Sequence, residues 1–190
     1  MVQPKLFMIL IGCTPPDRHT EQHDVFFGVG QNLYQLKQDI IDFWPEANGE
    51  VHIDAWREVT NVDGYKISIV NRQENITADS DKLFFINMGG YKQNEFEEFH
   101  YKMITVAANK GSAIQQAKQT AFYKHTGFKG AESHIDDKYG IDVDDIYNIE
   151  DILPQAVKEK YTINLVKEFP GKEDEMNLGY IKLNKLLAFS

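Results

Sequence analysis

A chain of 190 residues with 42% hydrophobic and 26% charged residues is long enough to bury one large core or two small ones. Its formal net charge of -9 opposes binding to polyanions, so we expect neither nucleic acid nor an anionic membrane as a partner. No apolar run approaches the roughly 18 residues of a membrane helix, and the N-terminal residues lack the features of a signal peptide. The single cysteine, Cys13, cannot form an internal disulfide, which is typical of a reducing compartment. We therefore expect a cytoplasmic protein.

The first predicted strand, residues 6–11, is a continuous apolar run of the kind that is buried on both faces of a sheet. Two successive prolines make residues 13–18 a loop. Residues 23–29 alternate as a second strand, with apolar side chains on both faces. Asn32 then begins a helix as its N-cap, and Pro45 ends it.

Two further strands are predicted before the middle of the chain, at residues 51–59 and 65–70. They are joined through Asp63-Gly64, a dipeptide that indicates a tight hairpin turn. The polar residues that follow carry no periodicity, and we place a linker at residues 76–81.

The second half repeats this order. Residues 84–88 and 101–107 are predicted strands, and Ser112 begins a helix that we expect to stop at Gly127. The alanines of this helix indicate close approach to another backbone. Two closing strands follow, at residues 161–166 and 180–183.

Residues 142–154 are acidic and partly apolar, and we interpret them as an insertion without a counterpart in the first half. Their carboxylates resemble a calcium loop, because Asp142, Asp144, Asp145 and Glu150 lie close together. The glycine and the terminal glutamate of an EF-hand are missing, which favours a solvated acidic turn.

The two halves also share residues. Sliding residues 5–41 by about 77 positions gives about nine identities, where unrelated segments would give roughly two. The pairs include Lys5/Lys82, Leu6/Leu83, Phe7/Phe84, Ile9/Ile86, Gly12/Gly89, Glu21/Glu98, His23/His100, Val29/Val106 and Gln38/Gln115. Beyond a short shift, residues 52–54 align with residues 134–136, and residues 65–70 align with residues 161–166.

These observations predict an α+β fold built from an internally duplicated β-β-α-β-β unit. The first repeat spans residues 1–75, and the second spans residues 82–190 with the acidic insertion and a C-terminal closing strand. We expect the two repeats to pack about a pseudo-twofold axis. Their sheets should be mostly antiparallel or mixed, with the helices on one face.

Four strings resemble a known family. They are Lys-Leu-Phe-Met at residues 5–8, the run from Glu21 to Gly28, His-Ile-Asp-Ala-Trp-Arg-Glu-Val at residues 52–59, and Val-Asp-Gly-Tyr at residues 62–65. Together they resemble a group of bacterial proteins that carry one or two copies of a domain of unknown function, number 1543. The resemblance implies an α+β domain, a duplication and no assigned activity. It implies no catalytic residues.

Each half contains a Glu-x-His element near the start of its second strand and a His-x-Asp element near the start of its third. Residues two apart on a strand point to the same side, so four donors converge if these strands are neighbours. Imidazole together with carboxylate suits zinc, iron, manganese or nickel, and such a site can activate water for hydrolysis. The predicted ligands to a divalent transition metal are Glu21, His23, His52, Asp54, Glu98, His100, His134 and Asp136.

Simpler interpretations of the same residues stay open. Polar pairs at strand entrances often hydrogen-bond the backbone of a loop, and a carboxylate can merely orient an imidazole. Cys13 with a histidine could form a nucleophile pair, although its counterpart in the second half is Gly90. For Trp56-Arg57-Glu58, a packed aromatic ring with a surface ion pair is the default expectation.

Two functions therefore follow from the sequence. One is a non-catalytic binding or interaction module, with a small molecule or a protein partner in the cleft between the repeats. The alternative is a metal-dependent hydrolase or related enzyme that uses the Glu-x-His and His-x-Asp elements. A homodimer whose sheets continue across subunits is a third arrangement. Convergence of the four donors in space would favour the enzyme.

Overall fold

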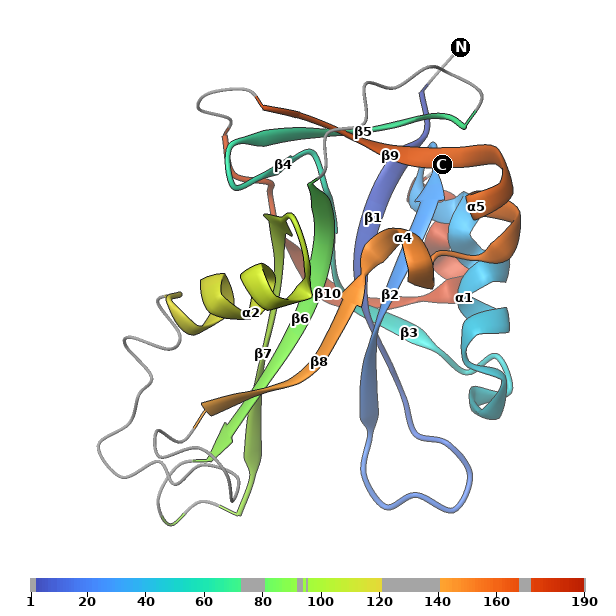
Figure 1. Ribbon diagram of the computed structural model, residues 1–190. Helices are drawn as coiled ribbons and strands as arrows, with labels where there is room; N and C mark the ends of the chain where they lie inside the picture. The colour runs from blue at the N-terminus through green and yellow to red at the C-terminus, as the bar shows by residue number, and fades with distance from the viewer. Residues whose placement is uncertain are drawn as a thin grey trace. The chain divides into compact units, whose positions relative to one another are not determined.

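The computed structural model describes residues 3–72, 81–91, 94, 96–120, 141–167 and 172–189. The chain forms two compact units (Figure 1), the first made of Met1–Thr77 with Leu153–Ser190 and the second of Ala78–Ile152. Every strand pairing within the described ranges is antiparallel. This result confirms the predicted α+β class with mostly antiparallel sheets. No helix in the described part of the chain is long and apolar enough to cross a membrane.

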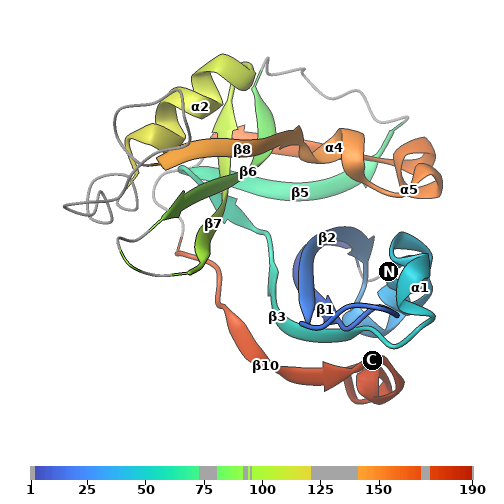
Figure 2. The same ribbon diagram turned by 90° about the horizontal axis from the view of Figure 1, so that it is seen from below.

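The main sheet of the first unit has the strand order β10-β3-β1-β2 (Figure 2). Its strands are β1 (Lys5–Cys13), β2 (Gln22–Gly30), β3 (His52–Glu58) and β10 (Asn177–Lys182). The first three strands lie within two residues of their predicted bounds. Because β1 is central and covered on both faces, almost all its side chains are buried or half-buried, as its continuous apolar run predicted.

Three short helical segments follow β2: η1 (Leu33–Leu36), α1 (Lys37–Phe43) and η2 (Pro45–Ala47). Asn32 caps the first of them, because its side chain accepts a hydrogen bond of 3.1 Å from the backbone N–H of Gln35. The apolar stripe of these segments packs on one face of the sheet. This core contains Phe7, Ile9, Ile11, Leu33, Leu36, Ile40 and Ile53.

The second sheet of this unit has the order β4-β5-β9 and consists of β4 (Asn61–Val62), β5 (Tyr65–Asn71) and β9 (Tyr161–Lys167). Asp63 and Gly64 both have positive φ, at 51° and 79°. These are the dihedral signs of the tight hairpin turn that the Asp-Gly pair predicted. The helix α5 (Gln155–Lys160) precedes β9 and buries Val157.

The last segments of the chain pack with the N-terminal ones. Strand β10 pairs with β3, and the 3-10 helix η3 (Leu183–Phe189) buries Leu183 and Leu186 in the same core as β1. The sequence analysis placed all of residues 82–190 in the second repeat. In the structure, residues from Leu153 onward belong to the first unit.

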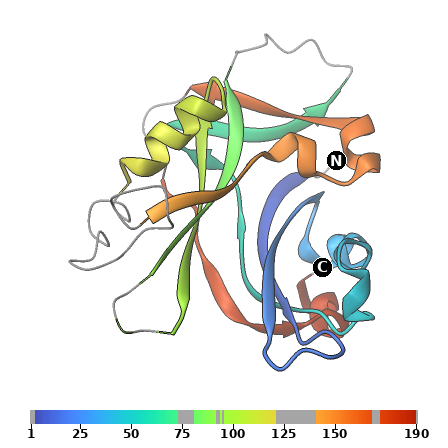
Figure 3. The same ribbon diagram turned by 60° about the horizontal axis from the view of Figure 1, so that its bottom comes forward.

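The second unit has one sheet of order β7-β6-β8 with a helix across one face (Figure 3). Its strands are β6 (Lys82–Tyr91), β7 (Glu98–Ala107) and β8 (Ile141–Asn148), and its helices are α2 (Lys110–Lys118) and α4 (Ile149–Ile152). Ala113 and Ala117 of α2 are fully buried against the sheet. Asn109 caps α2 by accepting a hydrogen bond of 3.0 Å from the N–H of Ser112, so the helix begins before the predicted position.

The solvated acidic turn that the sequence favoured for Asp142, Asp144 and Asp145 was wrong. Residues 141–148 form β8, which pairs with β6 along its length. The acidic residues concealed the strand because polar side chains occupy its exposed positions, while Ile146 and Val143 pack against the core. The predicted helix stop at Gly127 lies outside the described residues.

The buried position of η3 gives a test of the first unit's core. Leu186 is 0% exposed, whereas its neighbour Leu187 is 64% exposed. Leu186→Ala should lower the free energy of unfolding by about 2–5 kcal/mol, because it leaves a cavity in the core. Leu187→Ala should change it by less than about 0.5 kcal/mol. Urea denaturation followed by circular dichroism measures both, and equal effects would contradict this placement of the C-terminal segment.

Candidate metal centre

The candidate site of the first unit is built around Gly12, near the end of the central strand. Gly12 lies opposite His23 on β2 and opposite His52 on β3. The odd-numbered residues of β1, such as Ile9 and Ile11, point into the core. Because side chains alternate along a strand, Gly12 and its two histidine neighbours face the other side of the sheet.

A β-bulge and a short extension of β2 bring two carboxylates to the same side. The pairing of β1 with β3 shifts between Leu10 and Ile11, so that Ile11 pairs with Ile53 and Leu10 pairs with Ala55. No residue of β1 therefore lies opposite Asp54. A bulge of this kind changes the direction of a side chain. Glu21 stands two residues before His23 and reaches back over the same face.

Each carboxylate contacts both imidazoles. Glu21 Oε1 lies 3.1 Å from His52 Nε2, and Glu21 Oε2 lies 3.5 Å from His23 Nε2. Asp54 Oδ1 lies 3.4 Å from His52 Nε2, and Asp54 Oδ2 lies 3.3 Å from His23 Nε2. Glu21, His23 and His52 therefore offer three donor atoms that lie within 4.8 Å of one another, and Asp54 contacts both imidazoles.

This ring of donors differs from a set of ordinary hydrogen bonds. An imidazole Nε2 carries one hydrogen or one lone pair, in a single direction, so it cannot hydrogen-bond well to two carboxylates at once. Metal–ligand bonds of about 2.0–2.2 Å place neighbouring ligand atoms roughly 3.0–3.5 Å apart in octahedral or tetrahedral geometry. The distances of 3.1 to 3.5 Å around His23 and His52 fall in that range.

The site is buried on one side and open on the other. His52 is 5% exposed, and within the described residues its Nε2 has no hydrogen-bond partner of good geometry, nor has Asp54 Oδ2. The ring of Tyr180, on β10, stacks on the His52 ring with 4.3 Å between centroids. Glu21 and His23 are exposed. A ligand or water can therefore reach the donors from the side of Glu21 and His23.

The glycine at the centre leaves the room that the donors occupy. A Cβ atom at Gly12 would lie 2.6 Å from His52 Nε2, 2.8 Å from Asp54 Oδ2 and 3.0 Å from His23 Cδ2. No real side chain fits at such distances, so any other residue would displace the donors. In the sequence, Gly12 stood out only as one of the residues repeated in the second half, as the counterpart of Gly89.

The second unit gathers Glu98, His100 and Asp144 beside Gly89 of β6. His100 Nε2 lies 3.4 Å from Asp144 Oδ2 and 3.8 Å from Glu98 Oε2. Glu98 and His100 were predicted as ligands, whereas Asp144 was not. The predicted ligands His134 and Asp136 lie outside the described residues.

The alignment of residues 52–54 with residues 134–136 does not match the strand register. Gly89 on β6 lies opposite His100 on β7 and opposite Asp142 on β8, and a bulge places Asp144 between the residues that pair with Asn87 and Met88. The positions that His52 and Asp54 hold in β3 thus belong to Asp142 and Asp144 in β8. Both segments have an aspartate that follows an apolar residue, in His52-Ile53-Asp54 and in Asp142-Val143-Asp144. This shared pattern is the signal that a sequence comparison could have used.

Two other candidates from the sequence have structural roles. Burial raises the pKa of the Cys13 thiol, and the nearby Glu21 carboxylate adds to the rise in pKa, so this thiol is a poor nucleophile. Trp56 packs against Phe7 and Phe189, with ring centroids 6.2 and 6.5 Å apart. Beside it, the Glu58 carboxylate accepts a hydrogen bond of 2.7 Å from Lys5 Nζ and forms an ion pair with it. The expectation of a packed aromatic ring and a surface ion pair is confirmed.

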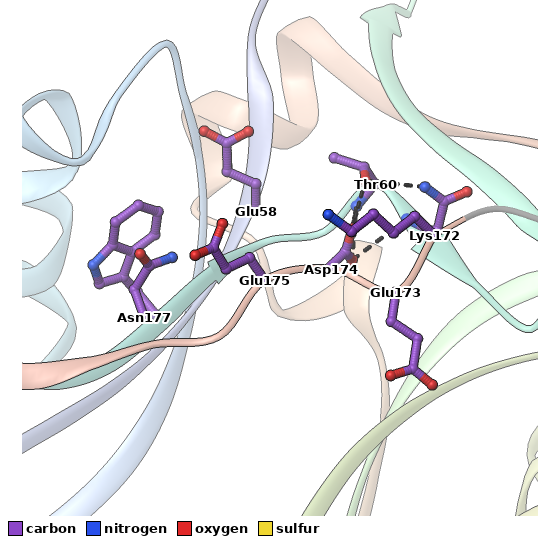
Figure 4. Close-up of a pocket in the computed structure, with 9 residues that line it drawn as sticks. Glu58, Thr60, Lys172, Glu173, Asp174, Glu175 and Asn177 are labelled. Atoms are coloured by element: carbon purple, nitrogen blue, oxygen red, sulfur yellow. Dashed lines mark hydrogen bonds between the residues drawn. The ribbon is translucent and has the colours of Figure 1, made fainter.

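A separate cavity of about 420 Å³ lies near the other end of β3 (Figure 4). Asp174 fixes one wall, because its carboxylate accepts hydrogen bonds from the backbone N–H and the hydroxyl of Thr60. None of the predicted ligands lines this cavity. Its lining consists of Trp56, Glu58, Thr60, Asn61, Lys172, Glu173, Asp174, Glu175 and Asn177.

The comparisons with known proteins agree with the fold and the predicted resemblance. Residues 18–69 match the family model described as Domain of Unknown Function (DUF1543). The DUF1543 segment contains all four donors of the first unit. The crystal structure of a protein from Idiomarina loihiensis is similar, with a TM-score of 0.59 and 22% identity, over 95% of this chain and 97% of that chain. At this identity the likeness shows the fold alone. No curated protein matches the chain.

The environment of Cys13 predicts slow alkylation. Because the pKa of its thiol is raised, mainly by burial, its thiolate fraction at pH 8 is below that of an ordinary cysteine. Iodoacetamide should modify the folded protein at least roughly tenfold more slowly than the urea-unfolded chain. Glu21→Gln should accelerate the reaction only slightly, since burial is the larger cause. Equal rates in the folded and unfolded protein, measured by mass spectrometry, would refute this description.

Proposed function

We propose that the first unit binds a divalent transition metal through Glu21, His23, His52 and Asp54, and that this centre serves a metal-dependent hydrolase. The supporting observation is that both carboxylates contact both imidazoles at 3.1 to 3.5 Å, and that donor atoms of Glu21, His23 and His52 lie within 4.8 Å of one another. Imidazole and carboxylate together suit zinc, iron, manganese or nickel. The nearly buried His52, whose Nε2 lacks a well-oriented partner among the described residues, fits the same interpretation.

The buried side and the exposed side of the site would have different roles. His52 and Asp54 form the inner wall, and the stacked ring of Tyr180 restricts the orientation of His52. Glu21 and His23 lie at the exposed rim, where a substrate would arrive. A bound divalent metal would supply Lewis-acid chemistry, lowering the pKa of a coordinated water toward neutrality.

A non-catalytic binding module is the second candidate, and a different observation favours it. The cavity of about 420 Å³ near Trp56 and Asp174 is large enough for a small ligand and is remote from the four donors along β3. Acidic side chains predominate among its charged lining residues, so a cationic small molecule suits it best. Binding between the two units, assembly into a homodimer and a cytoplasmic location stay predictions of the sequence.

We also infer that the two units contain copies of one ancestral sheet and helix. The pairing of β1 with β2 starts at Lys5 and Gly30, and the pairing of β6 with β7 starts at the aligned residues Lys82 and Ala107. The bulge opposite the central strand occurs at the same place in both sheets. The helix caps Asn32 and Asn109 are also aligned. The strand register, the bulge position and the helix cap thus agree between the two units, and similar amino-acid composition alone would not produce this agreement.

The strands β5 and β9 support a pseudo-twofold relation between the aligned segments that contain them. Tyr65 of β5 aligns with Tyr161 of β9, and the two strands pair so that Tyr65 lies opposite Lys167 while Tyr161 lies opposite Asn71. Exchanging the strands leaves this register unchanged. Ser68 lies opposite its own aligned residue, Asn164, which donates a 3.3 Å hydrogen bond to the Ser68 hydroxyl. A local twofold axis through this pair accounts for the register.

Zinc titration of metal-stripped protein tests the proposed centre. The folded protein should bind Zn²⁺ at this site, and saturating it at 100 times the dissociation constant should add about 2.7 kcal/mol to the free energy of unfolding. His52→Ala should weaken the tightest site more than about 100-fold, because even a change outside the ligands costs roughly 10–100-fold. Isothermal titration calorimetry and thermal melting provide the two measurements.

The matched control is His19→Ala, which removes an exposed histidine close in sequence to Glu21. It should bind Zn²⁺ like the parent protein. Gly12→Ala should weaken binding without removing a ligand, because its Cβ would overlap the donors. If His52→Ala and His19→Ala bind zinc equally, the proposed centre is wrong. Zinc binding without metal-dependent hydrolysis of ester or phosphoester probes would favour the non-catalytic module.

A further inference from the structure

Glu98, His100 and Asp144 lie together on the face of the second sheet that points away from α2. Even-numbered residues of β6, such as Ile86 and Met88, pack against α2. Gly89 therefore faces away from the helix, together with His100, which lies opposite it on β7. The bulge between β6 and β8 places Asp144 between the residues that pair with Asn87 and Met88, and its carboxylate lies beside Gly89 on the same face.

The donor atoms of this group converge. One donor atom from each of the three residues lies within 4.8 Å of the others. Asp144 Oδ2 lies 3.4 Å from His100 Nε2, a separation typical of two ligands on one metal ion. Glu98 Oε2 lies 3.8 Å from the same nitrogen, which a small side-chain rotation would shorten. The carboxylates carry two negative charges that one divalent ion would balance.

The space for these donors again comes from a glycine. A Cβ atom at Gly89 would overlap the Asp144 carboxylate and would lie 2.9 Å from Glu98 Oε1. Two carboxylates and an imidazole thus fill a recess that any other residue at this position would close. Gly12 of β1 makes room for donors in the same way in the first unit, where the neighbouring strands are β2 and β3.

The donor sets of the two sites differ. The first site has two imidazoles, whereas this group has one, and Asp142 holds the register position that His52 holds in β3. Imidazole favours zinc, nickel and copper, while carboxylates and water favour magnesium, calcium and manganese. The three side chains are each about one quarter to one third exposed, at 28%, 35% and 26%. Such a site leaves coordination positions for water, as Mg²⁺ and Mn²⁺ require.

We propose that Glu98, His100 and Asp144 form a second metal site, which selects a harder divalent cation of the Mn²⁺ or Mg²⁺ class than the first site does. The protein would then hold two ions of different chemistry, one in each unit. This inference goes beyond the proposed function, because either site can bind a metal without the other.

Mn²⁺ binding to the full, metal-stripped chain tests this proposal, with free Mn²⁺ measured by electron paramagnetic resonance. Two Mn²⁺ ions should bind each chain. Asp144→Asn should weaken one of them at least roughly tenfold and leave the other unchanged. The control is Asp145→Asn, which removes the same charge from the next residue, where the carboxylate instead accepts a hydrogen bond from Asn87. Asp145→Asn should retain both ions.

One equivalent of Zn²⁺ should displace Mn²⁺ from one site only, and the ion that remains should be the one that Asp144→Asn loses. If Asp144→Asn unfolds, His100→Asn provides a second variant, because the His100 side chain is about one third exposed. Equal Mn²⁺ binding by Asp144→Asn, His100→Asn and Asp145→Asn would overturn the second site. A different outcome separates the two proposals. If Asp144→Asn loses one Mn²⁺ ion but His52→Ala keeps both, the second site stands and the proposed function of the first unit fails.

Discussion

The arrangement of donors in the first unit depends on one missing side chain. Gly12 occupies the central strand between two histidines, and the donors fill the volume that a Cβ would take, at 2.6 Å from His52 Nε2 and 2.8 Å from Asp54 Oδ2. The strand is otherwise apolar and packed on both faces, so its position is fixed by the core. A rigid central strand with a gap at one residue is a good base for a ligand set, because neighbouring strands hold the donors at constant spacing.

The same arrangement carries an electrostatic cost. His52 Nε2 and Asp54 Oδ2 are buried without a hydrogen-bond partner in the described part of the chain, and each such group costs about 1–3 kcal/mol. Two carboxylates also share the same pair of imidazoles. A divalent cation would remove both costs, since it takes a lone pair from each donor and balances the charges. Protonated imidazoles could balance the charges too, but they could not give every oxygen a well-directed hydrogen bond.

Local sequence patterns predicted much of this fold. The apolar run of β1, the alternation of β2, the Asn32 cap and the Asp63-Gly64 turn each depend on neighbouring residues alone, and each is present. The Glu-x-His and His-x-Asp spacings indicated donors on one side of each strand. Their expected convergence assumed that the two strands are neighbours, whereas β1 lies between β2 and β3, and the contacts are made across Gly12.

Other features depend on contacts between distant residues. The pairing of β10 with β3 and of β9 with β5 assigns the end of the chain to the first unit, and no local pattern encodes such pairing. The bulge that directs Asp144 is likewise set by the register between two strands. Its acidic strand resembled a loop because three aspartates interrupt its apolar residues. The missed residues are therefore those whose roles arise only after strand pairing.

The most direct test of a metal centre in the first unit is anomalous X-ray diffraction from crystals grown with Zn²⁺, measured on both sides of the zinc absorption edge. The account predicts an anomalous peak about 2.0–2.2 Å from His23 Nε2 and His52 Nε2, with Glu21 and Asp54 completing the ligand set. Absence of a peak there, with each imidazole hydrogen-bonded to a single carboxylate, would contradict it.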